Sequence, residues 1–231
     1  MKDFHCQKSI MLTKMRYFDN YVQGAKSIHD LDISVHCDVF VFEWLMQFLH
    51  GPVEPRLELT NVISICISSE FLGIDILVEN CIIFIAKHLS DIVNLPIDLN
   101  CLNVKIVRRL AEKVSIKQLS SLKDKKDKLL SKIYHKKLEA LMQEHDATGK
   151  QLFRCVNCNL LYTEQQEKWM TCDKAKIIID SHGEAISQHL SDKYFDMFNF
   201  FEFMKKEGLT WKQIFWKIWA SMQTFKCSTC E

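Results

Sequence analysis

Two pairs of cysteines carry the clearest chemical signal in the sequence. Each pair has the spacing Cys-x-x-Cys, and the four thiols are Cys155, Cys158, Cys227 and Cys230. Two intervening residues let both thiolates of a tight turn face one ion, and two such turns supply four sulfur ligands for a tetrahedral zinc site. We therefore predict a structural Zn²⁺ at these residues, because a sphere of four thiolates leaves no position for water or a substrate.

Three other residues near these pairs are alternative ligands. Cys172 is a competing thiol, and His182 and His189 are possible imidazole ligands. The two pairs could also be ordinary thiols that bind no metal. A redox role is not favoured, because neither pair begins a helix after a buried strand in the manner of thioredoxin.

The residue patterns of common catalytic centres are not found. His182-Gly-Glu184 is a His-x-Glu sequence, but we expect it in a turn. A zinc-dependent base deaminase also needs a proline before its Cys-x-x-Cys, whereas Arg154 and Lys226 precede the two pairs here. We therefore predict that the chain is not an enzyme and that it acts as an interaction protein.

Composition and charge exclude further classes. The chain has 231 residues, of which 48% are apolar, and its 30 Lys and Arg residues nearly balance 29 Asp and Glu residues. This balance argues against a nucleic-acid-binding surface along the whole chain. No apolar run approaches the ~18 residues of a membrane span, and the N-terminus lacks the apolar core of a signal peptide. We expect an intracellular protein of the nucleus, the cytoplasm or both, whose 10 cysteines are reduced thiols or metal ligands.

The elements that must position these residues fall into an α+β arrangement. In the N-terminal part, apolar periodicity predicts helices at 9–22, 39–50, 60–69 and 100–115, and a helical hairpin of 74–80 and 81–89. Alternating apolar and polar residues predict short strands at 31–35 and 57–59, and Asp38 is placed to cap the helix at 39–50. We assign this helix cluster with short strands to a domain of residues 1–118.

A long amphipathic helix is predicted at 119–143, and we assign residues 119–147 to a basic linker helix. Seven lysines lie between Lys123 and Lys137. The simplest interpretation is a solvated helix face, and the alternative is a contact for phosphate or an acidic partner.

The C-terminal part, residues 148–231, is predicted to be a smaller α+β domain tied together by the zinc ion. Strands are expected at 152–163, 176–180 and 185–190, with a turn at 180–183. Two helices rich in aromatic residues are expected at 194–206 and 210–222, the second capped by Thr210.

Three N-terminal segments, 11–18, 32–48 and 57–89, together resemble a BTB/POZ domain. In that family a helix of the form Phe-x-x-Leu-x-x-Phe ends in glycine, as at 42–51 here. A helical hairpin of the form Phe-Leu-x₄-Leu-x₃-Cys follows, as at 71–81. The resemblance implies the BTB fold for this half of the chain.

The resemblance also implies partners. BTB domains form homodimers and recruit proteins such as corepressors or cullin-type ubiquitin ligases. We expect the strand that BTB protomers usually exchange to be missing, so the apolar face of the helix at 9–22 is the predicted dimer contact. Its residues are Leu12, Met15, Phe18 and Val22.

More narrowly, the chain resembles BTB proteins that also contain a SANT domain, although no segment of these 231 residues is interpreted as one. The residues that carry this resemblance lie at 32–38, 61–65, 122–128 and 216–219, together with the cysteine pairs. The resemblance implies a non-enzymatic, nuclear regulator of transcription or chromatin, with negative regulation of class switch recombination as its role. The alternative is a substrate adaptor of a cullin-type ubiquitin ligase.

Overall fold

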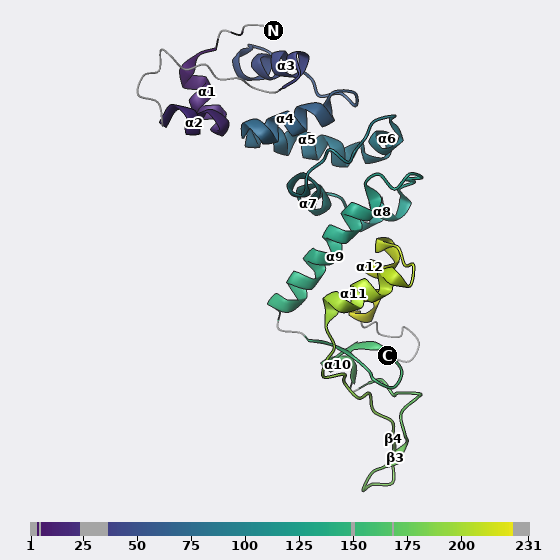
Figure 1. Cartoon of the computed structure of the whole chain (residues 1–231). Coiled ribbons are helices and arrows are strands. Elements are labelled where there is room, and N and C mark those ends of the chain that lie inside the picture. Colours follow the sequence, from purple (N-terminus) through teal and green to yellow (C-terminus); the bar gives the residue numbers. More distant parts are fainter. Residues whose placement is uncertain (1–3, 5, 24–36, 149–150, 168, 224–231) are drawn as a thin grey trace. The chain divides into compact units, whose positions relative to one another are not determined.

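The computed structural model describes residues 4, 6–23, 37–148, 151–167 and 169–223, and for 20–23 it describes only the backbone (Figure 1). The chain divides into two compact units, Met1–Leu129 and Leu130–Glu231, which we term the N-terminal unit and the C-terminal unit. Helices predominate among the described residues and the strands are short, which confirms the predicted α+β class. No helix in this part of the chain has the length and apolar character that crossing a membrane requires.

All regular elements in the described part of the N-terminal unit are helices. They are α1 (Lys8–Lys14), α2 (Arg16–Gln23), α3 (Val39–His50), α4 (Val62–Leu72), α5 (Asp75–Lys87), α6 (Leu89–Asn94), α7 (Val104–Lys113) and α8 (Ile116–Ser121). The helices α4 and α5 pack against each other at the centre, α2 and α3 contact α4, and α7 contacts α5. Their central position explains why α4 and α5 are apolar on most faces, with Ile65, Cys66, Cys81 and Ile85 fully buried.

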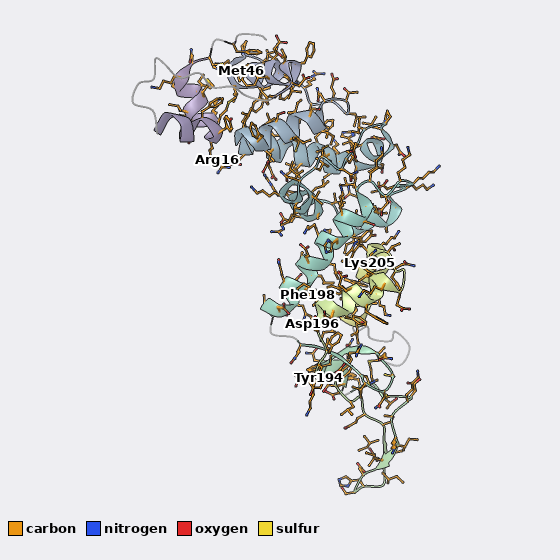
Figure 2. The ribbon with its side chains drawn as sticks, viewed as in Figure 1. Arg16, Met46, Tyr194, Asp196, Phe198 and Lys205 are labelled. Atoms are coloured by element: carbon orange, nitrogen blue, oxygen red, sulfur yellow. The ribbon has the colours of Figure 1, made fainter. Side chains whose placement is uncertain are left out.

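A glycine lets the chain turn back between α4 and α5. Gly73 has a φ of 72°, and its N–H donates to the carbonyl of Glu70 while the next N–H donates to the carbonyl of Ser69. This left-handed ending satisfies the last carbonyls of α4. A Cβ at Gly73 would lie 2.9 Å from the Cβ of Arg16, a residue labelled in Figure 2. The Arg16 guanidinium contacts Asp75, at the start of α5, at 2.6 Å. The turn therefore joins three helices closely.

Several predicted elements of the N-terminal unit need correction. The helix expected at 9–22 is broken at Met15, which is extended (φ −125°) and fully buried, so α1 and α2 are separate helices. The hairpin expected at 74–89 is mainly the single helix α5. The strand expected at 57–59 is wrong, because these residues run in a non-regular segment before α4, and the strand at 31–35 lies outside the described residues.

The predicted long helix at 119–143 is also wrong as one element. The helix α8 ends at Ser121, and α9 (Leu130–Ala147) begins only after the lysine-rich segment 122–129. Asp124 accepts a hydrogen bond from the N–H of Leu129 at 2.9 Å, and Asp127 has a left-handed φ of 48°. These two residues hold the segment in a turn, and the crowded lysines do not favour a helix there.

The C-terminal unit begins with α9, which packs against α12 (Trp211–Ser221). The fully buried Tyr134 lies 5.5 Å from Phe215, measured between ring centroids. The residues predicted as a linker helix therefore extend from the end of α8 into the C-terminal unit, and the compact units divide at Leu129. The predicted helix cap at Thr210 is confirmed, because Thr210 and Gln213 form a reciprocal capping box at the start of α12.

The rest of the C-terminal unit contains two small antiparallel hairpins and two further helices. β1 (Leu152–Arg154) pairs with β2 (Leu161–Thr163), and β3 (Ile178–Ile179) pairs with β4 (Ala185–Ile186). The helix α10 (Glu164–Glu167) follows β2 directly, and α11 (Met197–Lys206) precedes α12. Asp196 caps α11 by accepting from the N–H of Asn199 at 2.7 Å, and the nearby Tyr194 and Phe198 are exposed (Figure 2).

Candidate metal centre

The turn that contains Cys155 and Cys158 connects β1 to β2. The N–H of Cys155 donates to the carbonyl of Leu160, and the N–H of Asn159 donates to the carbonyl of Cys155, both at 2.9 Å. Asn159 has a φ of 60°, a left-handed conformation that asparagine tolerates better than most residues. The hairpin therefore fixes both thiols on one short loop.

A second segment reaches this turn from the β3–β4 hairpin. At the root of that hairpin the N–H of Cys172 donates to the carbonyl of Ser187 at 2.8 Å, and the Ser187 hydroxyl donates to the carbonyl of Cys172. The N–H of Val156 donates to the carbonyl of Leu190 at 2.9 Å. His189 lies between these two tethers, which bring its ring to the cysteine turn.

Four side chains meet where these segments join. One ligand atom from each of Cys155, Cys158, Cys172 and His189 lies within 4.8 Å of the others. The sulfur atoms of Cys155 and Cys172 are 3.8 Å apart, and the sulfur of Cys158 is 3.4 Å from Nδ1 of His189. Cys155, Cys172 and His189 are buried, and Cys158 is partly buried. This group of donors could bind a metal ion.

The thiols of this cluster differ in pKa. Burial opposes ionisation of Cys155, but hydrogen bonds from the backbone at Cys158 and from His189 outweigh it and lower the pKa of Cys155 to about 6. Burial, together with the neighbouring thiols of Cys155 and Cys172, raises the pKa of Cys158 to about 11. One thiolate is therefore favoured at neutral pH, whereas a second is disfavoured unless a cation offsets its charge.

Aromatic rings and an ion pair border the cluster. The ring of Tyr162 is fully buried and stacks on His189 at 5.0 Å and on Phe153 at 5.7 Å, measured between ring centroids. Burial, with the charges of Glu167 and the cysteines, raises the pKa of Tyr162 to about 12. Arg154 contacts Asp192 at 2.6 Å. Tyr162 and Phe153 thus pack against the cysteines of the cluster.

The four predicted zinc ligands have different outcomes. Cys155 and Cys158 lie together in the cluster, as the Cys-x-x-Cys spacing predicts. Cys227 and Cys230 lie outside the described residues, so their part in a metal site stays a prediction.

Of the three alternative ligands, two lie in the cluster and one does not. Cys172 and His189 lie in the cluster. His182 lies in the exposed turn of the β3–β4 hairpin, where its N–H donates to the side chain of Asp180 at 2.8 Å. The His-x-Glu sequence is therefore part of a turn, as expected. The sequence offered no signal that separates His189 from His182, because only the pairing of β3 with β4 brings the former back to the cysteines.

The predicted dimer residues lie on α1 and α2 and at the break between them. Met15 and Phe18 are buried within the N-terminal unit, and Leu12 is partly buried. The side chain of Val22 lies outside the described residues. The assignment of these residues to a dimer face stays a prediction.

Comparison with known protein families gives a match for part of the chain. No solved structure matches the chain. Residues 1–82, all within the N-terminal unit, match the family described as "SANT and BTB domain regulator of CSR, BTB domain". BTB domains generally mediate self-association and binding to other proteins. The N-terminal part of the chain is thus similar to the BTB domain of the SANT and BTB domain regulator of CSR.

Proposed function

We propose that this chain is a non-enzymatic interaction module that forms homodimers through its N-terminal unit and regulates transcription or chromatin by recruiting other proteins. The observation that carries the proposal is the match of residues 1–82 to the BTB domain of a regulator of CSR, which we take to mean class switch recombination. Negative regulation of that process is the specific role we propose. The nucleus is the expected site of action, with the cytoplasm as a second location.

The surface of the N-terminal unit supports a binding role. Phe40, Ile76 and Val104 are 80%, 70% and 60% exposed. Apolar side chains of this kind contribute to a partner-binding surface where they form a contiguous patch.

The dimer is tested by light scattering of the purified chain at several concentrations. Leu12→Glu places a charge on the predicted contact and should shift the mass toward the monomer. Thr13→Glu is the matched control, because Thr13 is an exposed residue on the same helix, and it should leave the mass unchanged. A monomer in the parent chain at tens of micromolar would refute self-association. Met15 and Phe18 are poor probes, because their burial makes any substitution also a test of folding.

The class of partner is tested by affinity purification from cells. Enrichment of corepressor subunits supports the proposed regulator. Enrichment of a cullin subunit supports the alternative, a substrate adaptor of a ubiquitin ligase, which shares the BTB-type N-terminal unit as its support.

We propose further that the C-terminal unit binds one structural Zn²⁺. The support is the group of three thiols and one imidazole, a donor set that suits zinc and leaves no open coordination position. Metal analysis of the purified chain tests this, and less than about half an equivalent of zinc would contradict one closed, fully occupied site.

A further inference from the structure

We propose that the zinc ion is held by the Sγ atoms of Cys155, Cys158 and Cys172 and by Nδ1 of His189, and that these four donors complete its coordination sphere. This assignment rests on the structural zinc proposed above and names its ligands. It differs from the set that the Cys-x-x-Cys spacing alone favours.

Two of the six distances between the donors fit a tetrahedron. With Zn–S bonds of about 2.3 Å and a Zn–N bond of about 2.05 Å, tetrahedral geometry puts two sulfurs about 3.8 Å apart and a sulfur and a nitrogen about 3.6 Å apart. The observed separations are 3.8 Å between the sulfurs of Cys155 and Cys172, and 3.4 Å between the sulfur of Cys158 and Nδ1 of His189. Two edges of the tetrahedron are therefore present to within about 0.2 Å.

The imidazole of His189 is oriented for coordination through Nδ1. This nitrogen faces the sulfur of Cys158, one face of the ring stacks on Tyr162, and Nε2 is buried with no hydrogen-bond partner among the described residues. Coordination through Nδ1 places the remaining ring proton on Nε2. Nδ1 is therefore the ring nitrogen that this arrangement offers to an ion.

Backbone hydrogen bonds hold the three ligand segments in place independently of the side chains. Cys155 is fixed within the β1–β2 hairpin, Cys172 is tied to Ser187, and the residue after His189 is tied to Val156. The next contact, from the N–H of Asp192 to the carbonyl of Arg154 at 2.8 Å, extends this pairing. A site whose ligands are positioned by the fold loses less entropy when it binds an ion.

The chemistry of the donors selects the metal. Thiolates and imidazole suit zinc, whereas Mg²⁺ and Ca²⁺ require oxygen ligands. Four ligands also complete the tetrahedral sphere. If Cys227 and Cys230 bound this ion, they would displace Cys172 and His189, which are only 1% and 4% exposed. Two buried donors that already face Cys155 and Cys158 would then make no bond to the ion.

With the proposed ligands, the ion would connect the two hairpins of the C-terminal unit. Cys172 and His189 lie on the two sides of the β3–β4 hairpin, and Cys155 and Cys158 belong to the β1–β2 hairpin. One ion would therefore join the roots of both hairpins, which otherwise depend on a few backbone hydrogen bonds and a small cluster around Tyr162.

Cobalt substitution of the full chain tests the ligand assignment. Co²⁺ occupies tetrahedral zinc sites, and its charge-transfer absorption grows with the number of thiolate ligands. The double variant Cys227→Ser/Cys230→Ser should bind one equivalent with the spectrum of the parent chain. His189→Cys keeps a complete donor set and should increase the charge-transfer absorption in the ratio of four thiolates to three, whereas Cys172→Ser should decrease it. Nitrogen-15 NMR of the zinc-bound chain should show His189 protonated at Nε2.

The outcomes distinguish an error in the ligand assignment from the absence of a zinc site. A loss of thiolate absorption in Cys227→Ser/Cys230→Ser, with no change in His189→Cys, would overturn the ligand assignment and leave the structural zinc intact. Failure of the parent chain to bind either Zn²⁺ or Co²⁺ would overturn both. Because His189→Cys retains four ligands, its result does not depend on a variant that fails to fold.

Discussion

The stability of the C-terminal unit should depend on free Zn²⁺, and the stability of the N-terminal unit should not. All four proposed ligands lie in the C-terminal unit, between Cys155 and His189. An ion that binds only the folded state stabilises it by RT ln(1 + [Zn²⁺]/Kd). Each tenfold rise of free zinc above Kd should therefore add about 1.4 kcal/mol to the free energy of unfolding, reaching about 4 kcal/mol at a thousandfold excess.

The distribution of tryptophan makes the two units separable in one experiment. Of the five tryptophans, Trp44 alone lies in the N-terminal unit, so Trp44→Phe leaves fluorescence that reports only on the C-terminal unit. Urea unfolding of this variant is measured at a series of buffered zinc concentrations. The midpoint should rise with zinc, while circular dichroism should show a helical transition of the N-terminal unit that stays fixed.

A matched pair of cysteine variants controls the experiment. Cys172→Ser should flatten the zinc dependence, whereas Cys101→Ser, at an exposed thiol of the N-terminal unit, should preserve it. Because burial and neighbouring thiols raise the pKa of Cys158 to about 11, zinc must displace its proton at neutral pH, so apparent affinity should weaken by about tenfold or more for each pH unit lowered. An unfolding midpoint of the C-terminal unit that does not change with zinc concentration would refute the predicted stabilisation by zinc.

Three further predictions concern single residues. Glu79→Gln should lower the free energy of unfolding at pH 7 by about 1 kcal/mol, because hydrogen bonds from Lys113 and Arg109 lower the pKa of Glu79. A group with a lowered pKa stabilises the fold above its unfolded pKa of about 4.3, and this stability is lost as the pH falls through the folded pKa. The denaturation curves of parent and variant should therefore converge as the pH is lowered through the folded pKa of Glu79. Gly73→Ala should cost about 1–2 kcal/mol because of its left-handed φ and the 2.9 Å approach to the Cβ of Arg16, and an unchanged melting temperature of the N-terminal unit would contradict this. Tyr162→Phe should change the free energy of unfolding by less than about 1 kcal/mol, since the hydroxyl is buried without a hydrogen-bond partner among the described residues. Tyr162→Ala removes the ring and should cost about 3–5 kcal/mol. Equal losses of stability for the two variants in calorimetry would show that the ring does not support the cluster.

Local signals in the sequence were enough to predict several helices. The periodicity at 39–50 gives the bounds of α3, and Asp38 accepts hydrogen bonds from Phe40 and Val41 as an N-cap should. The capping box at Thr210 likewise marks the start of α12. Such elements are predictable because the residues that define them are close in sequence.

The metal cluster depends on contacts that local patterns do not encode. The Cys-x-x-Cys spacing identifies Cys155 and Cys158, since both lie in one turn. Cys172 and His189 join them only through the pairing of β3 with β4, which consists of two residue pairs and has no alternating pattern strong enough to fix its register. The break before α9 has a different reason. Asp124 and Asp127 form a local turn, but the apolar residues on both sides of it continue the helical period, which predicts one uninterrupted helix.

The β3–β4 hairpin has a consequence for the behaviour of the chain in the cell. Ile177, Ile178 and Ile179 are consecutive and each is at least 66% exposed, and the two-stranded ribbon leaves both outer edges without a neighbouring strand among the described residues. A bare aliphatic edge of this kind is a template for cross-β growth. If an ion at its root holds this ribbon in place, zinc starvation should cause the chain to aggregate, and the amount of soluble chain recovered from cells would then depend on metal supply.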